Sequence, residues 1–317
     1  MAKNTKEIQR RIKSIKNTRK ITRAMEMVSA AKMKKEVAKV LSIRDYARSA
    51  WGVLTNLSRA FEGYEHGLLK IRPVKRILVV LITSNRGLCG GYNSQIIRKT
   101  IQQVKKPALL KINRVKNNRL VSDIEDDKIK FSFVAVGKKG YEYLVRNDYE
   151  VIAYFDKFNY DPSAEDIRGL AKIVIDDYST EKYDKVVVAY TDYVNPLVQK
   201  PKLRQILPIS KIDLEKQIME IKGGELTEDE KIIDYKIEPE PAEVVEYILP
   251  RLVELQLYHA VLESNASKES ARMIAMRNAT EAAGDMIMEL EYAFNQLRQM
   301  SITQEIAEIT SGRVALE

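Results

Sequence analysis

The chain has 317 residues, of which 45% are hydrophobic and 31% are charged, and its formal net charge is +9. One cysteine and two histidines exclude an internal disulfide and leave no Cys/His cluster with metal-ligand spacing. No stretch approaches the 18 apolar residues that indicate a membrane-spanning helix, and the basic N-terminus lacks the apolar region of a signal peptide. A transit peptide is not expected either, because the helical pattern starts by Ile8.

A long helix is the first predicted element, because the first Gly is Gly52 and the first Pro is Pro73. Its apolar residues form two stripes at helical spacing, Ile8, Ile12 and Ile15, then Ile21, Met25 and Val28. The six-residue step between the stripes predicts a shift of register there. The helix is therefore expected to pair along one narrow face and to leave its basic remainder to solvent or to another partner.

The middle of the chain alternates predicted strands and helices. The expected strands are Arg76–Thr83, Phe131–Val136, Val151–Tyr154 and Lys185–Tyr190, and the expected helices are Tyr92–Val104, Lys138–Arg146 and Ala164–Tyr178. This alternation predicts a small Rossmann-like α/β domain with a largely parallel sheet. Asp192–Pro208 is expected to be a hairpin or long loop, and Lys105–Lys130 and Lys222–Lys231 are expected to be surface insertions.

A glycine-rich segment, Ser84–Tyr92, follows the first predicted strand, where a Rossmann fold carries its phosphate loop. Its glycines do not have the G-x-G-x-x-G spacing, and the Lys-Ser/Thr of a Walker loop is missing. We therefore interpret the segment as a structural turn rather than a nucleotide site. No catalytic triad, cofactor site or metal site is predicted anywhere in the chain.

The C-terminal segment carries a heptad pattern from Val245 to Leu297. Steps of three and four residues give Val245, Ile248, Leu252, Leu255, His259, Leu262, Ala266, Glu269, Met273, Met276, Thr280, Ala283, Ile287, Leu290, Phe294 and Leu297. Thirteen of these sixteen positions are apolar, which predicts a coiled-coil seam. Beyond it lies a shifted stripe, Ile302, Ile306 and Ile309, for which the chain offers no partner.

The charge is distributed unevenly between the two ends. Residues 1–40 carry thirteen Lys/Arg against three Glu, whereas residues 242–317 carry six Lys/Arg against twelve Asp/Glu. Opposite charges favour antiparallel pairing of the two helices into a long coiled coil. We therefore divide the chain into an N-terminal helix (1–60), the α/β domain (74–235) and a C-terminal helix (242–317). The surplus positive charge needs an acidic neighbour, which could be protein, phosphate or lipid.

Four segments closely resemble signatures of the gamma subunit of F-type ATP synthases. They are Ile21–Met33 (ITRAMEMVSAAKM), Ser84–Tyr92 (SNRGLCGGY), Ala271–Thr280 (ARMIAMRNAT) and Ser301–Gly312 (SITQEIAEITSG). The resemblance covers essentially the whole chain. It implies a non-catalytic rotor subunit that transmits torque between a membrane ring of c subunits and the catalytic sites on the beta subunits of a proton-translocating enzyme.

The same resemblance implies partners and contact residues. The partners are three alpha and three beta subunits around one copy of this chain, the epsilon subunit and the c-ring, at the cytoplasmic face of the bacterial inner membrane. Contacts with beta subunits are implied for Met25, Arg272, Arg298, Gln299 and Thr303, contacts with a hydrophobic sleeve of the hexamer for Val314 and Leu316, and contacts with the c-ring for Tyr235 and Glu238.

Two other classes of function remain open from the residues alone. The basic N-terminal helix and the isoelectric point near 9.3 would suit a nucleic-acid-binding coiled coil, although aromatic residues hardly interrupt the basic segment. An α/β enzyme with helical arms would bind a nucleotide. The predicted absence of a phosphate loop argues against it.

Overall fold

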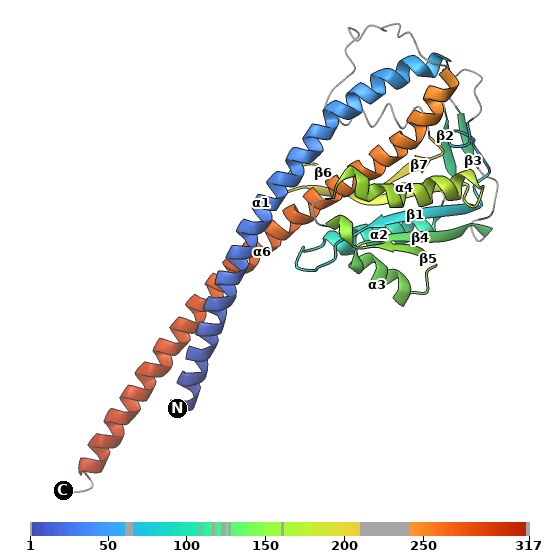
Figure 1. Cartoon of the computed structure of the whole chain (residues 1–317). Coiled ribbons are helices and arrows are strands. Elements are labelled where there is room, and N and C mark those ends of the chain that lie inside the picture. Colours follow the sequence, from blue (N-terminus) through green and yellow to red (C-terminus); the bar gives the residue numbers. More distant parts are fainter. Residues whose placement is uncertain are drawn as a thin grey trace. The chain divides into compact units, whose positions relative to one another are not determined.

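Helices occupy both ends of the chain, as the lack of helix-breaking residues predicts. The computed structural model describes residues 2–60, 66–107, 110–115, 118–121, 125, 128–159, 162–209 and 241–314. Helix α1 spans Ala2–Ala60 and helix α6 spans Pro241–Val314 (Figure 1). Pro241 stands at the first position of α6, where the missing N–H costs no helical hydrogen bond. Within the described residues, no helix combines the length and apolarity that crossing a bilayer requires.

The chain divides into two units, and both long helices contribute to each. We call the first unit the shaft; it consists of residues 1–31 and 272–317. The second unit, residues 32–271, is called the sheet domain.

The sheet domain contains the predicted α/β alternation. Its elements are β1 (Arg76–Ile82), α2 (Tyr92–Lys105), β2 (Ile112–Val115), β3 (Asn118–Val121), β4 (Lys130–Val136), α3 (Lys138–Arg146), β5 (Val151–Phe155), the short 3-10 helix η3 (Lys157–Asn159), α4 (Ala164–Ser179), β6 (Lys185–Tyr193) and β7 (Gln199–Leu207). The four predicted strands and three predicted helices are confirmed to within three residues at each end. Asp192–Pro208 is part of a β6–β7 hairpin, and the insertion after α2 carries the β2–β3 hairpin.

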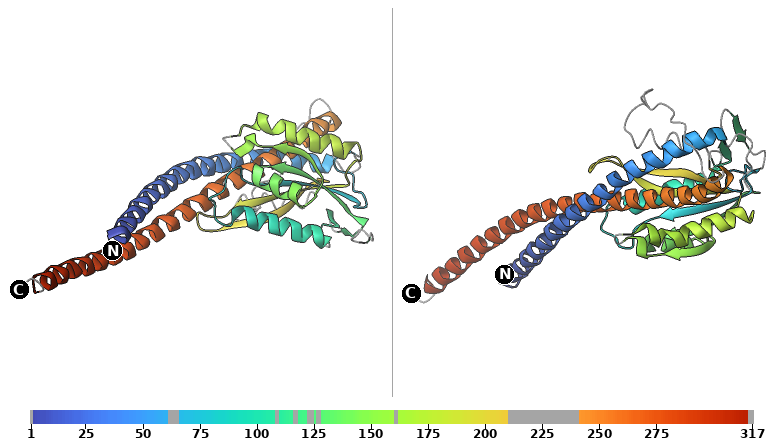
Figure 2. Two further views of the ribbon diagram at one scale, coloured as in Figure 1. Left: turned by 90° about the horizontal axis from the view of Figure 1, so that it is seen from below. Right: turned by 45° about the horizontal axis from the view of Figure 1, so that its top comes forward.

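The main sheet has the strand order β5-β4-β1-β6-β7, and only the β6–β7 pair is antiparallel. Helices cover both faces, and the left view of Figure 2 shows α4 along one face and α2 along the other. Because side chains alternate along a strand, Leu78 and Val80 of β1 pack toward α4 and α6, whereas Ile77 and Val79 pack toward α2 and α3. This explains why β1 is a continuous apolar run.

Helix α6 forms part of the core of the sheet domain. Leu252, Val253, Leu257 and Val261 pack in the same cluster as the β1, β6 and α4 side chains. All residues from 259 to 270 are buried, on every side of the helix. The heptad pattern predicts burial on one face only, so this enclosure goes beyond what the sequence indicated.

The shaft is an antiparallel helix pair. Lys16 Nζ lies 2.6 Å from Glu291 Oε1, and Thr22 Oγ1 lies 2.7 Å from Thr280 Oγ1, so partner numbers fall along α6 as they rise along α1. Every predicted seam position of α6 in the shaft, from Met273 to Leu297, is buried or half-buried. The C-terminal seam and the antiparallel pairing are therefore confirmed.

The predicted second stripe of α1 is wrong in part. Met25 is half-buried, but Ile21 and Val28 are 60% and 54% exposed. The seam instead continues through Thr22 and Ser29, which are 8% and 2% exposed. These residues follow the first stripe in unbroken steps of seven, from residue 15 to 22 to 29, so the helix does not change register.

A small polar seam residue suits a close contact between the helices. Thr22 Oγ1 donates to the backbone oxygen of Arg19 at 3.1 Å and accepts a hydrogen bond from Thr280 Oγ1. Thr280 Oγ1 also lies 2.8 Å from the backbone oxygen of Met276, so each hydroxyl has partners although it lies between helices. A bulky isoleucine in place of Thr22 would separate the helices at this level.

The turn between β4 and α3 yields the first testable prediction. Gly137 has a φ of +92°, and a Cβ there would lie 2.2 Å from the backbone oxygen of Thr83. Gly137→Ala should therefore lower the free energy of unfolding by about 3 kcal/mol or more. Gly169→Ala is the matched control, because its nearest atom is 3.9 Å away on Phe155 and its helix should gain up to about 1 kcal/mol. Urea unfolding that ranks the two variants equally would contradict this account.

The shaft seam yields a second prediction. Ile287 is 5% exposed, so Ile287→Ala should cost about 2–4 kcal/mol through lost contacts and a cavity. Met288, its neighbour in sequence, is 63% exposed, so Met288→Ala should change stability by less than about 0.5 kcal/mol. Thermal unfolding followed by the helical circular dichroism signal separates the two outcomes. Equal losses from both variants would mean that the seam does not pack as described.

Candidate functional site

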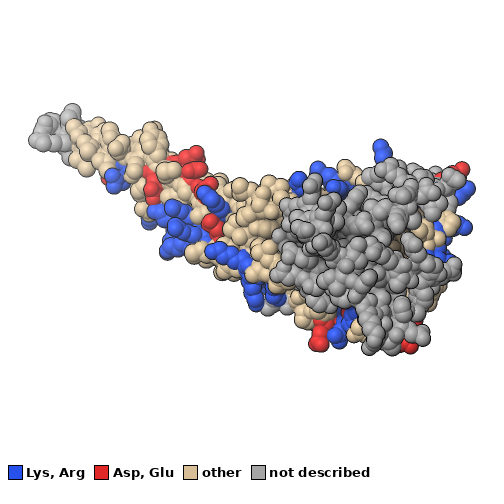
Figure 3. All heavy atoms as spheres, turned by 90° about the horizontal axis from the view of Figure 1, so that it is seen from above, with Lys and Arg blue, Asp and Glu red and all other residues tan. Residues whose placement is uncertain are grey.

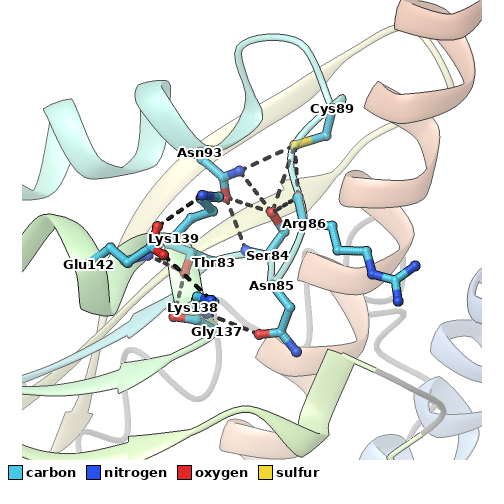
Figure 4. A network of polar contacts seen from close by, with 11 residues as sticks. Thr83, Ser84, Asn85, Arg86, Cys89, Asn93, Gly137, Lys138, Lys139 and Glu142 are labelled. Atoms are coloured by element: carbon cyan, nitrogen blue, oxygen red, sulfur yellow. Dashed lines mark hydrogen bonds and ion pairs between the residues drawn. The ribbon is translucent and has the colours of Figure 1, made fainter.

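The loop after β1 is the segment in which a nucleotide site would be sought. Ser84 N–H donates to Asn93 Oδ1 at 3.0 Å, and Asn93 Nδ2 donates to Ser84 Oγ at 2.8 Å and to Cys89 Sγ at 3.3 Å (Figure 4). Cys89 is 2% exposed. These contacts join the loop to the first turn of α2.

Protein groups also occupy the N-terminus of α3, the neighbouring place for a phosphate. The N–H groups of Lys138, Lys139 and Gly140 donate to Asn85 Oδ1 at 3.0 Å, to the Ser84 oxygen at 3.0 Å and to Thr83 Oγ1 at 2.9 Å (Figure 4). A phosphate at a helix N-terminus would need these same donors. The geometry therefore favours the structural turn over a nucleotide site. The described residues also contain no group of His, Cys, Asp and Glu that could hold a metal ion.

The surface of the shaft offers a different kind of site, one for protein partners. Its Lys and Arg side chains gather along one flank, with acidic side chains beside them (Figure 3). The Lys16–Glu291 pair crosses between the helices, but both side chains are about half exposed, so it adds only about 0–1 kcal/mol. This exposed ion pair therefore contributes little to the stability of the shaft.

Large apolar side chains are also exposed on the shaft. On α1 they are Ile21, Met27 and Val28, and on α6 they are Met286, Met288, Tyr292, Met300, Ile302, Ile306 and Ile309. The exposure of Ile302, Ile306 and Ile309, at 48%, 59% and 74%, agrees with the expectation that this stripe has no partner within the chain. The exposure of Ile21 and Val28 was not predicted from the sequence. The seven-residue spacing from Ile15 to Thr22 and Ser29 is the sequence signal that indicates the buried seam.

The end of α6 extends beyond the beginning of α1 within the shaft (Figure 1). Helix α6 has 74 residues against 59 in α1, and residues 302–311 are exposed. Single apolar residues on a surface are ordinary, but a run of exposed isoleucines along one helix end marks an interaction site.

The structure describes the side chains of five of the expected partner-contact residues. Arg298, Gln299 and Thr303 are exposed on α6, and Thr303 Oγ1 donates to the Gln299 backbone oxygen at 2.9 Å, which places the last two on one helix face. Met25 of α1 and Arg272 of α6 are half-buried.

The remaining expected contacts cannot be placed. Val314 is the last residue of α6, and its side chain is not described. Leu316, Tyr235, Glu238 and the charged insertion Lys222–Lys231 lie outside the described residues.

Comparison with solved structures agrees with this architecture. A central-stalk/c-ring chain of the Tetrahymena thermophila mitochondrial ATP synthase is 27% identical, with a TM-score of 0.54 over 82% of this chain and 99% of that chain. A rotor chain of the Euglena gracilis mitochondrial ATP synthase has a TM-score of 0.61 over 95% of this chain and 100% of that chain. At 19% identity, the second likeness concerns the fold alone.

Sequence comparison defines the family. The protein-family profile described as ATP synthase matches residues 4–316. ATP synthase gamma chains from Legionella pneumophila (strain Corby) and Roseiflexus castenholzii are 36% and 38% identical, each over 315 residues. These alignments cover 98% and 99% of this chain and 99% and 98% of the relatives. The chain therefore belongs to the family of ATP synthase gamma chains.

Proposed function

We propose that this chain is the central-stalk rotor of a proton-translocating ATP synthase and transmits torque between a membrane c-ring and catalytic sites on beta subunits. Membership of the gamma chain family carries the proposal. The chain is a non-catalytic subunit. To transmit torque, a subunit must be stiff and must have an asymmetric surface. The packed seam from Met273 to Leu297 supplies stiffness, and two unlike helices supply asymmetry.

The exposed tip of α6 supports a position inside a ring of other subunits. Ile302, Ile306 and Ile309 expose apolar surface that a protein partner would bury. A hexamer of three alpha and three beta subunits would enclose them, and Val314 and Leu316 would turn in its apolar sleeve. An apolar contact suits a rotating part, because it is non-directional and does not fix one angle as hydrogen bonds would.

Contacts with beta subunits are proposed where the shaft exposes polar and basic groups. Arg298, Gln299 and Thr303 would meet a beta loop at one angle of rotation, and Arg272 would form a further contact. The basic flank near Met25 would face an acidic segment of beta, which would balance the surplus charge of α1. Screened charges act over about 8 Å at physiological salt, so such contacts change with the angle of rotation.

At the other end, the sheet domain would stand on the c-ring beside the epsilon subunit. Tyr235 and Glu238 would contact the ring. In this arrangement the chain is a peripheral subunit at the cytoplasmic face of the bacterial inner membrane. Nothing in the comparisons favours the nucleic-acid-binding alternative.

The apolar tip gives a third prediction. Replacing Ile302, Ile306 and Ile309 together by Ser should weaken binding to an alpha–beta hexamer by about 100-fold or more, because each buried Ile contributes about 1.5–3 kcal/mol. The matched control replaces the equally exposed polar residues Gln304 and Glu308 by Ala and should bind nearly as the original chain does. Titration of hexamer with labelled chain measures both. Unchanged affinity of the triple Ser variant would remove the tip from the interface.

Assembly gives a fourth prediction. Affinity-tagged chain, co-expressed with cognate alpha and beta subunits, should be recovered in a complex of three alpha, three beta and one tagged copy, as determined by native mass spectrometry. The presence of a single copy distinguishes a rotor from other partners, because one asymmetric subunit must stand at the centre of the hexamer. Recovery of the tagged chain alone or as a homodimer would contradict the proposal. A salt-sensitive mobility shift with DNA would then support the nucleic-acid alternative.

A further inference from the structure

A cluster of ionisable side chains lies between α6 and the β6–β7 hairpin, inside the sheet domain. The hairpin is attached to α6 by neutral hydrogen bonds from Ser267 Oγ to the Thr191 oxygen at 3.0 Å and from Ser270 Oγ to the Pro196 oxygen at 2.6 Å. One helical turn before Ser267, the side chain of Glu263 reaches the same hairpin and is 7% exposed. This carboxyl group has no role in the proposed rotor function.

Three elements surround Glu263 with charged or titratable groups. Helix α6 contributes His259, whose Nε2 lies 3.5 Å from Glu263 Oε1. Strand β6 contributes Asp192, whose carboxyl group lies within hydrogen-bonding reach of the Glu263 side chain, and β7 contributes Lys202 and Arg204. Lys202 Nζ lies 2.7 Å from Asp192 Oδ2, so this lysine forms an ion pair with Asp192.

A hydrogen bond between two carboxyl groups requires a proton, because ionised carboxylates only accept. The ion pair with Lys202 keeps the negative charge on Asp192, which assigns the proton to Glu263. Burial raises the pKa of Glu263 to about 8, with Asp192 acting in the same direction and Arg204 and Lys202 opposing it. The carboxyl group of Glu263 is therefore neutral at neutral pH and becomes charged under mildly alkaline conditions.

We propose that Glu263 and Asp192 share one proton and that this proton fastens α6 to the β6–β7 hairpin, forming a latch that loosens as the pH rises. Loss of the proton replaces the hydrogen bond by two adjacent carboxylates in a buried site. The neutral serine contacts remain, so the hairpin loosens while the core of the sheet domain stays folded. The latch lies wholly within the sheet domain and stands independently of the rotor function.

The direction of the pH effect follows from proton linkage. The attached state holds the Glu263 proton up to about pH 8, whereas in an opened state the solvated carboxyl group loses it near its ordinary pKa of about 4.5. Between these values the attached state binds more protons than the opened state. The equilibrium constant for release of the β6–β7 hairpin from α6 therefore rises by up to about tenfold per pH unit, and this rise levels off above about pH 8.

Infrared difference spectroscopy of the full chain tests the protonation directly. At about pH 6.5 the wild-type spectrum should contain a protonated-carboxyl stretch that is absent from Glu263→Gln and that disappears by about pH 9.5. Asp192→Asn should move this titration to lower pH, because it removes the adjacent negative charge. Identical spectra of wild type and Glu263→Gln at about pH 6.5 would overturn the proposal.

Hydrogen exchange of the β6–β7 amides, corrected for the intrinsic pH dependence, tests the latch. Wild type should show opening that increases up to about tenfold per pH unit between about pH 6 and pH 8. Glu263→Gln, whose amide can donate to Asp192, should show no such increase. Glu289→Gln is the matched control, since Glu289 is an exposed glutamate of the same helix, and it should follow wild type. Parallel profiles for wild type and Glu263→Gln would overturn the latch.

Discussion

Helix α6 is buried on all sides between residues 259 and 270, and both units of the chain include parts of this helix. A helix buried on all sides cannot slide or turn within the sheet domain without breaking the packing of Leu257 and Val261 and the hydrogen bond of Tyr92 Oη to the Ser264 oxygen at 3.1 Å. The same helix continues to Val314 and supplies the longer member of the shaft. A force on the sheet domain therefore acts on a helix that is anchored in its core, as a torque-transmitting subunit requires.

The seam of the shaft contains both apolar residues and small polar residues. Ile287 and Met276 are buried as in an ordinary coiled coil, whereas Thr22 and Thr280 meet through their hydroxyl groups. This arrangement leaves Ile21 and Val28 on the surface, and the isoleucines near the end of α6 are exposed as well. Exposed apolar groups reduce solubility, so a chain that keeps them is expected to work inside an assembly that covers them.

The sequence predicted most of the fold because local patterns determine it. The apolar run of β1 and the lack of Gly and Pro before Gly52 each indicate one structure. Hydrophobicity favours Ile21 and Val28 over Thr22 and Ser29, so the α1 seam was predicted incorrectly although the seven-residue spacing indicates Thr22 and Ser29. The burial of these two residues depends on the opposite helix, which is distant in sequence. Buried polar groups such as Glu263 were missed for the same reason, since their partners are distant in sequence. The proposed contact residues came from family resemblance and not from a physical pattern.

Rotation of this chain within an alpha–beta hexamer can be observed through an attached bead. Leu197, in the β6–β7 turn, is 79% exposed, so Leu197→Cys with Cys89→Ser leaves one accessible cysteine to which a bead can be attached. With the alpha–beta hexamer fixed to a surface, ATP should drive the bead around continuously in one direction, and the motion should stop when ATP is exhausted. Undirected fluctuation of the bead while the hexamer hydrolyses ATP at its full rate would contradict the claim that this chain is the rotor.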